Sequence, residues 1–221
     1  MLRAHLQQQR VNFVIGDIRR GIPATAADNS FHPVKDLFAL DPSFRWDGEP
    51  RVETMFIKYF HAEDTEYVRA ISKRFLMSGV ARIFRPGCQL DTAVIIEGPQ
   101  GFYKANALRV LAIRDPEWYS NQVKTITEKN IAYLLAGKLI VEIPEMQALL
   151  RAKDSARKAF LEQREDEFRP PWATHKIYLP RQSIYVITIN PPTGGRYLTD
   201  ETGGRRYNPL TCRSKEGPSN D

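Results

Sequence analysis

The sequence predicts an α/β fold built on a largely parallel sheet. Three short apolar runs, at residues 92–96, 139–143 and 183–188, are rich in β-branched residues, as fully buried strands are. Segments with helical spacing separate these runs, and a glycine-rich turn joins the first run to the helix that follows it. Strands that alternate with helices favour parallel pairing, because each parallel connection has to cross over the sheet.

The residues before the first strand predict a helical subdomain that spans residues 1 to about 90. Its first clear helix follows a turn cluster at 46–50, after which apolar residues recur at helical spacing. A second helix begins near Asp64 or Thr65, either of which can cap it, and ends at the turn Arg85-Pro86-Gly87. Residues 1 to about 45 give weaker signals.

The α/β core is predicted to span residues 91–212. After the first strand a helix runs through Leu108 and Leu111, and a further helix is expected from Asp154 to Glu167. The third strand leads into Asn190. The tail at 213–221 is polar, and we expect it to be disordered.

Composition argues against several classes of protein. No run approaches the roughly 20 apolar residues of a membrane span, and the start of the chain lacks the apolar core of a signal peptide. Cys88 and Cys212 lie far apart, which argues against a disulfide scaffold or a zinc site and favours a cytoplasmic location. The formal net charge of +6 is compatible with a nucleic-acid partner, and equally with a basic protein that binds none.

The turn after the first strand lies where a phosphate-binding loop belongs. In the pattern GxxxxGK[ST], backbone amides surround the phosphates, the lysine reaches the β- and γ-phosphates, and the hydroxyl holds magnesium. Here the first glycine is Gly98 and the lysine is Lys104, with Gly101 inside the turn. Tyr103 replaces the second glycine, where a bulky residue is strained if φ is positive, and Ala105 replaces the hydroxyl residue. On the residues alone, an ordinary strand-turn-helix remains the alternative.

The segments around this loop carry a series of short motifs. In chain order they are His32-Pro33-Val34, Trp46-Asp47-Gly48-Glu49-Pro50-Arg51, Arg85-Pro86-Gly87-Cys88, Glu97-Gly98-Pro99-Gln100-Gly101, Asp166-Glu167-Phe168-Arg169-Pro170-Pro171-Trp172, Pro180-Arg181-Gln182 and Leu198-Thr199-Asp200-Glu201-Thr202-Gly203-Gly204-Arg205-Arg206-Tyr207. Taken together and in this order, they resemble the virulence-associated protein E family over about residues 30–212.

The resemblance implies a P-loop NTPase fold of the AAA+ and superfamily 3 helicase type, with the helical subdomain in front of it. It implies ATP and Mg²⁺ as cofactors, single-stranded or replication-fork DNA as a partner, and assembly into a homo-oligomeric ring. Proteins of this family often accompany primases in phages and other mobile elements. The expected function is therefore that of a DNA-replication ATPase of helicase type, with a primase as a further candidate partner.

By the same resemblance, residues after the second and third strands take roles in ATP hydrolysis. Glu142 matches a carboxylate that holds magnesium and Glu145 one that orients the attacking water, with their order left open. Asn190 matches the polar sensor residue, and Arg205 or Arg206 an arginine that acts on the nucleotide of a neighbouring subunit. On the residues alone, these positions are also explained by a solvated strand end, a turn asparagine and a basic turn.

The segment at 164–181 interleaves basic and aromatic residues. Arg169, Lys176 and Arg181 can contact phosphates, and Trp172 can stack on a base. A basic hairpin or loop that packs on the core explains the segment equally well. If the segment binds DNA, we expect binding to single strands that depends on salt and tolerates many sequences.

The residues at positions 103 and 105 divide the functional prediction in two. Lys104, the acidic residues and the arginine pair favour an ATPase that moves on DNA. Tyr103 and Ala105 favour a non-hydrolysing module that binds DNA or joins a ring. We therefore expect ATP hydrolysis to be weak or absent.

Overall fold

The computed structural model describes residues 32–40, 47–101, 103–112, 116–128, 130–146, 149, 151–169, 176–190 and 204–212. The chain divides into two compact units between Asp47 and Gly48. The first unit contains the helix α3 (Pro33–Leu40), whose first turn carries Asp36, where a negative charge complements the helix dipole. The strands that the structure describes belong to the second unit.

The second unit is built on a five-stranded sheet in which all neighbouring strands are parallel. The strand order is β2 (Tyr119–Ser120), β3 (Ile140–Pro144), β6 (Ile184–Ile189), β1 (Ala93–Glu97) and β7 (Tyr207–Thr211). In register, Ala93 of β1 pairs with Tyr185 on one side and with Tyr207 on the other. Because the strands are parallel, the residues that follow each strand gather at one edge of the sheet.

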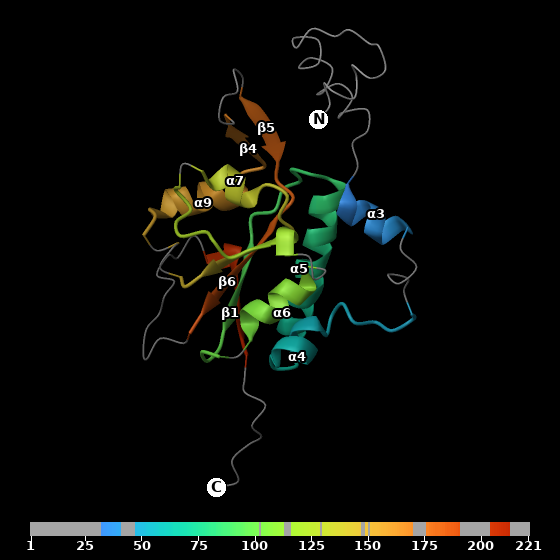
Figure 1. The fold of residues 1–221 in the computed structure, drawn as a ribbon. Coiled ribbons are helices and arrows are strands. Elements are labelled where there is room, and N and C mark those ends of the chain that lie inside the picture. Colours follow the sequence, from blue (N-terminus) through green and yellow to red (C-terminus); the bar gives the residue numbers. More distant parts are fainter. Residues whose placement is uncertain are drawn as a thin grey trace. The chain divides into compact units, whose positions relative to one another are not determined.

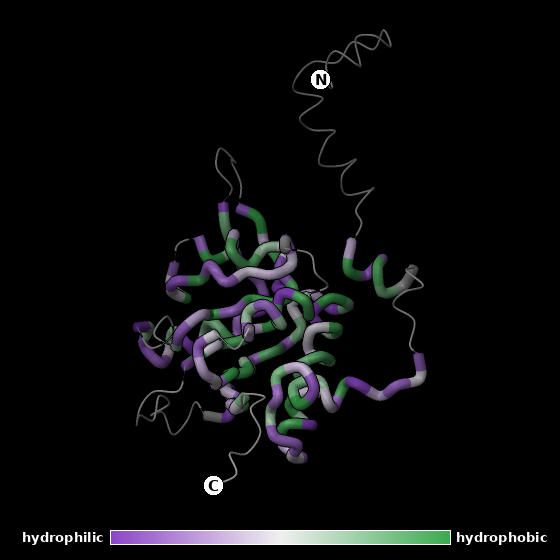
Figure 2. The backbone as a smooth tube through the Cα atoms, turned by 60° about the horizontal axis from the view of Figure 1, so that its bottom comes forward, coloured by the Kyte–Doolittle hydropathy of each residue, from purple (hydrophilic) through white to green (hydrophobic). Residues whose placement is uncertain are grey.

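The three strands predicted from apolar runs are confirmed, and they lie together in the sheet as β1, β3 and β6. Every residue of β6 is buried, and in β1 and β3 only the last residue is partly exposed. Figure 2 shows the hydrophobic strands inside the unit, with the hydrophilic segments toward its outside. Strands covered on both faces need continuous apolar runs rather than alternation, which is why the sequence identified them.

Helices cover both faces of this sheet (Figure 1). On one face lie α7 (Ile131–Leu135) and α9 (Asp154–Glu162), whose apolar residues join the core cluster of the strands. On the other face α5 (Glu66–Phe84) contacts β6, and α6 (Lys104–Leu111) contacts β3. Gly79 permits the close approach of α5, since a Cβ there would lie 3.3 Å from Cδ1 of Ile184.

The predicted ends of α5 are confirmed. Thr65 is the N-cap, and its Oγ1 accepts a hydrogen bond from the Val68 N–H at 3.2 Å. Asp64, the other candidate cap, instead forms an exposed ion pair with Arg69 at 2.6 Å. The shorter helix α4 (Met55–Phe60) contacts α5 within the same unit.

The helix expected from Asp154 to Glu167 is wrong in its second half. Helix α9 ends at Glu162, and β4 (Glu165–Phe168) follows, paired antiparallel with β5 (Ile177–Pro180). Asp166 is buried between exposed neighbours, as strand alternation requires, because Arg181 holds its carboxylate inside the unit. This long-range ion pair overrides the local helical pattern.

Two further strands gave no usable signal in the sequence. Strand β2 has only two residues, and β7 contains Pro209, which an edge strand tolerates because its outer side needs no ladder hydrogen bond. The predicted division of the chain near residue 90 stays a prediction, and the expected disordered tail lies outside the described residues. Within the part of the chain that the structure describes, no helix combines the length and apolar character needed to cross a membrane.

Candidate functional site

The carboxyl ends of β1 and β6 lie side by side in the sheet. After β1 the chain continues through α6 to β2 at the far side of the sheet, whereas after β6 it continues to β7 on the other side of β1. In open α/β sheets, ligands bind where neighbouring strands send their connections in opposite directions. Gly98 follows β1 and Asn190 follows β6, so the predicted loop and the predicted sensor residue meet at this switch point.

Lys104, the first residue of α6, places its ammonium group between the ends of β1 and β6. It donates hydrogen bonds to the Gly98 carbonyl at 2.5 Å, the Ile189 carbonyl at 3.0 Å and Asn190 Oδ1 at 3.2 Å. A longer contact of 3.4 Å reaches the Pro99 carbonyl. The structure thus brings together Gly98, Lys104 and Asn190 from the predicted site. An ammonium has three donors, so an incoming phosphate has to exchange with these oxygens.

Cys212 packs against Gly98, the first residue of the loop. It is buried, and its N–H donates to the Glu97 carbonyl at 2.7 Å. A Cβ at Gly98 would lie 3.3 Å from both Cβ and the carbonyl oxygen of Cys212, so position 98 has little room for any other residue. Burial lowers the pKa of Lys104, although Cys212 and Glu142 act in the opposite direction. Burial also raises the pKa of Cys212 to about 12, which keeps it a thiol at neutral pH.

Tyr103 has the left-handed backbone that a glycine adopts without strain. Its φ is 52° and its ψ is 20°, and Gly101 two residues earlier has a φ of 81°. A non-glycine residue is disfavoured there, so the loop carries the expected strain at Tyr103. The tyrosine side chain, however, is 81% exposed and stands in solvent. The loop therefore keeps a glycine-like path, and the ring does not fill it.

Glu142 is buried in β3, and residues of the strands on both sides donate hydrogen bonds to its carboxylate. Thr188 of β6 donates its hydroxyl to Oε1 at 2.6 Å, and Tyr119 of β2 donates its hydroxyl to Oε2. Burial and the bond to Glu142 raise the pKa of Tyr119, so its hydroxyl stays a donor. Each carboxylate oxygen of Glu142 consequently has a hydroxyl partner, and the side chain is fixed across three neighbouring strands.

Glu145 lies just beyond the end of β3 and is exposed. Its φ is 57°, and its N–H donates to the Thr188 carbonyl at 2.9 Å, so the backbone turns sharply at this point. The residue borders an open hollow of about 910 Å³, which Lys124 and Arg151 also line. The described residues that line this hollow do not include Gly98, Lys104 or Asn190.

The residues around Lys104 do not fit a magnesium ion held by the protein. Magnesium requires oxygen ligands in near-octahedral geometry, and a phosphate-binding loop supplies a Ser or Thr hydroxyl directly after the lysine. Ala105 offers no oxygen at that position, and both oxygens of Glu142 already accept hydroxyl hydrogen bonds. Among the described residues, no group of three or more His, Cys, Asp or Glu side chains is placed to hold a metal ion.

The arginine pair lies at the amino-terminal end of the parallel strands, whereas the loop after β1 lies at their carboxyl-terminal end. Arg205 and Arg206 belong to the short helix η3 (Gly204–Arg206), which directly precedes β7. Because β7 is parallel to β1 and has five residues, roughly 16 Å of strand separates this pair from the loop after β1. Arg206 is buried and forms an ion pair with Glu162 of α9, whereas Arg205 is exposed. Neither residue is placed to reach its own chain's Lys104.

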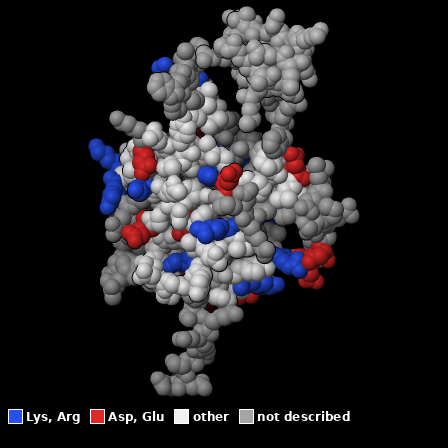
Figure 3. Space-filling view, viewed as in Figure 1, with Lys and Arg blue, Asp and Glu red and all other residues white. Residues whose placement is uncertain are grey.

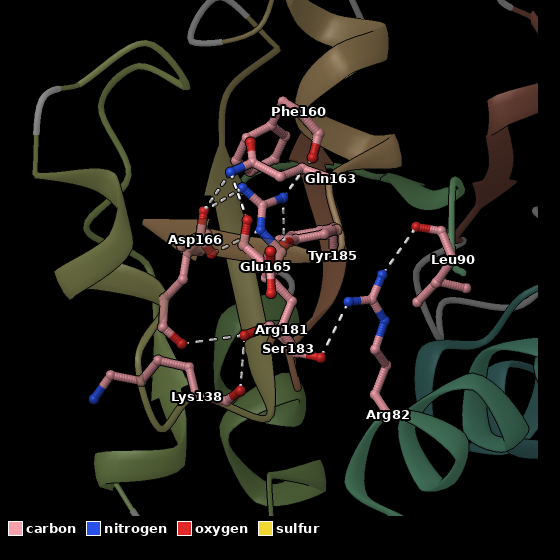
Figure 4. A network of polar contacts seen from close by, with 11 residues as sticks. Arg82, Leu90, Lys138, Phe160, Gln163, Glu165, Asp166, Arg181, Ser183 and Tyr185 are labelled. Atoms are coloured by element: carbon pink, nitrogen blue, oxygen red, sulfur yellow. Dashed lines mark hydrogen bonds and ion pairs between the residues drawn. The ribbon is translucent and has the colours of Figure 1, made fainter. Parts of the chain in front are cut away.

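Arg181, predicted to contact DNA, is instead part of a buried network (Figure 4). Its Nε and Nη2 donate to the two oxygens of Asp166, both at 2.8 Å, and Nη1 donates to the Phe160 carbonyl and the Tyr185 hydroxyl. The side chain is 1% exposed, so no phosphate can reach it. Arg82 of α5 joins the network by donating to the Arg181 carbonyl at 3.1 Å. Burial thus corrects the DNA-binding assignment of Arg181.

The other predicted DNA-contacting residues flank the two-stranded sheet β4–β5. Arg169 follows β4 and is exposed, and Lys176, which precedes β5, is exposed and ion-paired with Glu167. Trp172 lies outside the described residues. On the face drawn in Figure 3, basic and acidic side chains of the described residues are interspersed, so the positive net charge is not gathered into one patch there.

Three site residues were missed by sequence reasoning. Thr188 lies on β6, two positions before Asn190, which follows the strand, and could have been found by strand periodicity. Tyr119 sits in a two-residue strand, and Cys212 sits in a bridge to Ala62, so neither has a local signal for its position.

Comparison with known proteins gives one family. The profile of the virulence-associated protein E-like domain matches residues 40–220. No curated protein matches the chain.

The chain is similar over part of its length to several solved structures. Two of them are described as the A form apo structure of the NrS-1 C terminal region-CTR and of the NrS-1 C terminal region-CTR (305-718); both are 19% identical, with TM-scores of 0.49 and 0.48. The matched regions include 73% and 74% of this chain, respectively. A third, the apo structure of the NrS-1 C terminal region (305-718), is 18% identical with a TM-score of 0.46, over 73% of this chain. The chain spans only 37–38% of the length of these structures.

Proposed function

This chain belongs to the virulence-associated protein E-like family, and we propose on that premise that it is the nucleotide-binding core of a replication ATPase of helicase type from a phage or mobile element, with impaired hydrolysis. The observation that carries the proposal is the contact of Lys104 with Asn190 at the carboxyl ends of β1 and β6. A lysine at the start of a helix, after a strand and a glycine-containing turn, is the arrangement that reaches nucleotide phosphates. ATP is therefore the proposed ligand.

Impaired hydrolysis follows from what the site lacks chemically. Phosphoryl transfer in such sites depends on a magnesium ion that bridges the β- and γ-phosphates. Ala105 cannot ligate it, and Glu142 is engaged by Tyr119 and Thr188. Glu145 is the exposed carboxylate left to orient a water molecule. These features equally support a second candidate function, a non-hydrolysing module that binds DNA or joins a ring of intact subunits.

A ring assembly is part of the proposal because of where Arg205 lies. An arginine at the amino edge of the sheet cannot serve the nucleotide site at the carboxyl edge of its own chain, but a neighbouring copy can present it there. Arginines supplied in this way stabilise the charge of the transferring phosphoryl group. Arg206 has an internal partner in Glu162, so Arg205 is the better candidate of the pair.

DNA is the proposed polymer partner, with a primase as a proposed protein partner by family resemblance. The β4–β5 hairpin supports DNA contact, because Arg169 is exposed at its end and Tyr178 on β5 is 59% exposed. Basic groups bind the backbone of single strands and aromatic rings stack on bases. Lys176 contributes less than its charge suggests, since Glu167 pairs with it.

The test is an ATP-hydrolysis assay on the full chain with magnesium and single-stranded DNA. The wild type is expected to hydrolyse ATP weakly or not at all, and Tyr103→Gly with Ala105→Ser is expected to raise the rate. Arg205→Ala should then lower the restored rate more than it lowers ATP affinity, because such an arginine acts mainly in the transition state. Robust wild-type turnover that Lys104→Ala abolishes would contradict the proposed impairment.

A further inference from the structure

The groups that surround Lys104 suit a bare phosphate better than a metal–phosphate complex. The ammonium group supplies a positive charge at the ends of β1 and β6, and its present partners are oxygen atoms that a phosphate oxygen can replace. Position 105, which in a phosphate-binding loop supplies the magnesium ligand, carries only a methyl group. Resting on the proposed function, we infer that this site binds free nucleoside di- or triphosphate, with an affinity that magnesium does not strengthen.

The partners of Glu142 restrain its carboxylate from turning toward a metal. Its oxygens accept hydrogen bonds from Tyr119 and Thr188, which come from the strands on either side of β3. Turning the carboxylate toward a metal would leave two buried hydroxyls without their acceptor. Buried polar groups that lose their partners carry the full desolvation penalty, so the hydroxyls hold Glu142 in place.

The loop itself remains able to receive phosphate. Tyr103 keeps the left-handed backbone at the start of α6, and its ring points into solvent rather than into the loop. Tyr103 provides no side-chain cap for α6, so the first amides of the helix face the loop without a side-chain acceptor. A phosphate there meets amide donors and the Lys104 ammonium together, which is sufficient for an anion and requires no metal.

The experiment is an equilibrium titration of the full chain with ATP and with ADP, each in excess magnesium and in EDTA. We expect the wild-type affinity in magnesium to be no more than about threefold tighter than in EDTA. Ala105→Ser restores a hydroxyl ligand and should make binding at least about tenfold tighter in magnesium than in EDTA. Ala107→Ser adds the same hydroxyl to α6 at a position away from the loop, and it should behave like the wild type.

The outcomes separate this inference from the proposed function. Binding in EDTA that Lys104→Ala abolishes, with no gain from magnesium, supports both. Wild-type binding that magnesium strengthens more than about threefold overturns the metal-free site and leaves the nucleotide-binding function standing. Absence of nucleotide binding in every condition, for a chain whose circular dichroism and unfolding transition are intact, overturns the proposed function and this inference with it.

Discussion

Removal of the Asp166 carboxylate would leave two guanidinium groups buried without an acidic partner. The side chains of Arg181 and Asp166 are 1% and 5% exposed, and they are joined by two hydrogen bonds of 2.8 Å. Arg82 is fully buried beside them and donates to carbonyl oxygens, while its Nε has no partner. The network therefore depends on the single negative charge of Asp166, which Gln163 also contacts.

We expect Asp166→Ala to lower the free energy of unfolding by about 3–5 kcal/mol, the range for breaking a buried ion pair by removing one partner. With a urea m-value of about 2 kcal/mol/M, the unfolding midpoint would fall by about 2 M. The double variant Asp166→Leu with Arg181→Met removes both charges and should recover most of the loss, because a buried pair replaced by apolar residues is often neutral.

The assay is urea unfolding followed by circular dichroism and by tryptophan fluorescence. Glu53→Ala, which breaks the exposed pair between Glu53 and Lys73, is the matched control and should barely move the midpoint. An Asp166→Ala midpoint equal to that of the control would refute the reasoning. Weaker DNA binding by Arg181→Met at unchanged stability would restore the DNA-contacting role of Arg181.

Four further expectations concern the site and its surroundings. In the folded chain an alkylating reagent should modify Cys88 and spare buried Cys212, with both reacting in denaturant. The pKa of Cys212 is raised to about 12, so above pH 9 its thiol keeps a proton in the folded state that it loses in the unfolded state. The free energy of unfolding should therefore fall between pH 9 and 12, and it should fall less in Cys212→Ala. Arg206→Ala should destabilise the fold more than Arg205→Ala in thermal unfolding, since only Arg206 is buried against Glu162. Affinity for single-stranded DNA should fall with salt with a log–log slope of about −0.7 per phosphate. It should weaken in Arg169→Ala with Lys176→Ala and hold in Lys58→Ala with Arg74→Ala, which removes the same charge elsewhere.

The sequence predicts the central strands well because their burial leaves a local signature. The apolar runs of β1, β3 and β6 need no knowledge of their neighbours, and the turn residues at 98–101 mark the loop between β1 and α6. The contact between Lys104 and Asn190 could have been predicted, because both residues follow parallel strands whose carboxyl ends lie on the same side of the sheet.

Long-range partners explain what the sequence could not predict. Asp166 and Arg181 lie 15 positions apart, and no local pattern distinguishes a buried arginine from one that faces solvent. For residues 164–181 the sequence left DNA contact and a basic hairpin packed on the core as equal alternatives, and the structure shows the hairpin β4–β5, which the Asp166–Arg181 ion pair holds. Likewise, Glu142 has the same sequence context whether its oxygens face a metal or the hydroxyls of Tyr119 and Thr188.

The most direct test of the account is whether Lys104 binds a nucleotide. The measurement is equilibrium titration of the full chain with ATP, comparing the wild type, Lys104→Ala and Lys58→Ala, with urea unfolding to show that each variant is folded. We expect the wild type and Lys58→Ala to bind alike and Lys104→Ala to lose at least about tenfold in affinity, because charge-assisted contacts are lost. Equal binding by a folded Lys104→Ala variant, or no binding by the wild type, would contradict this expectation.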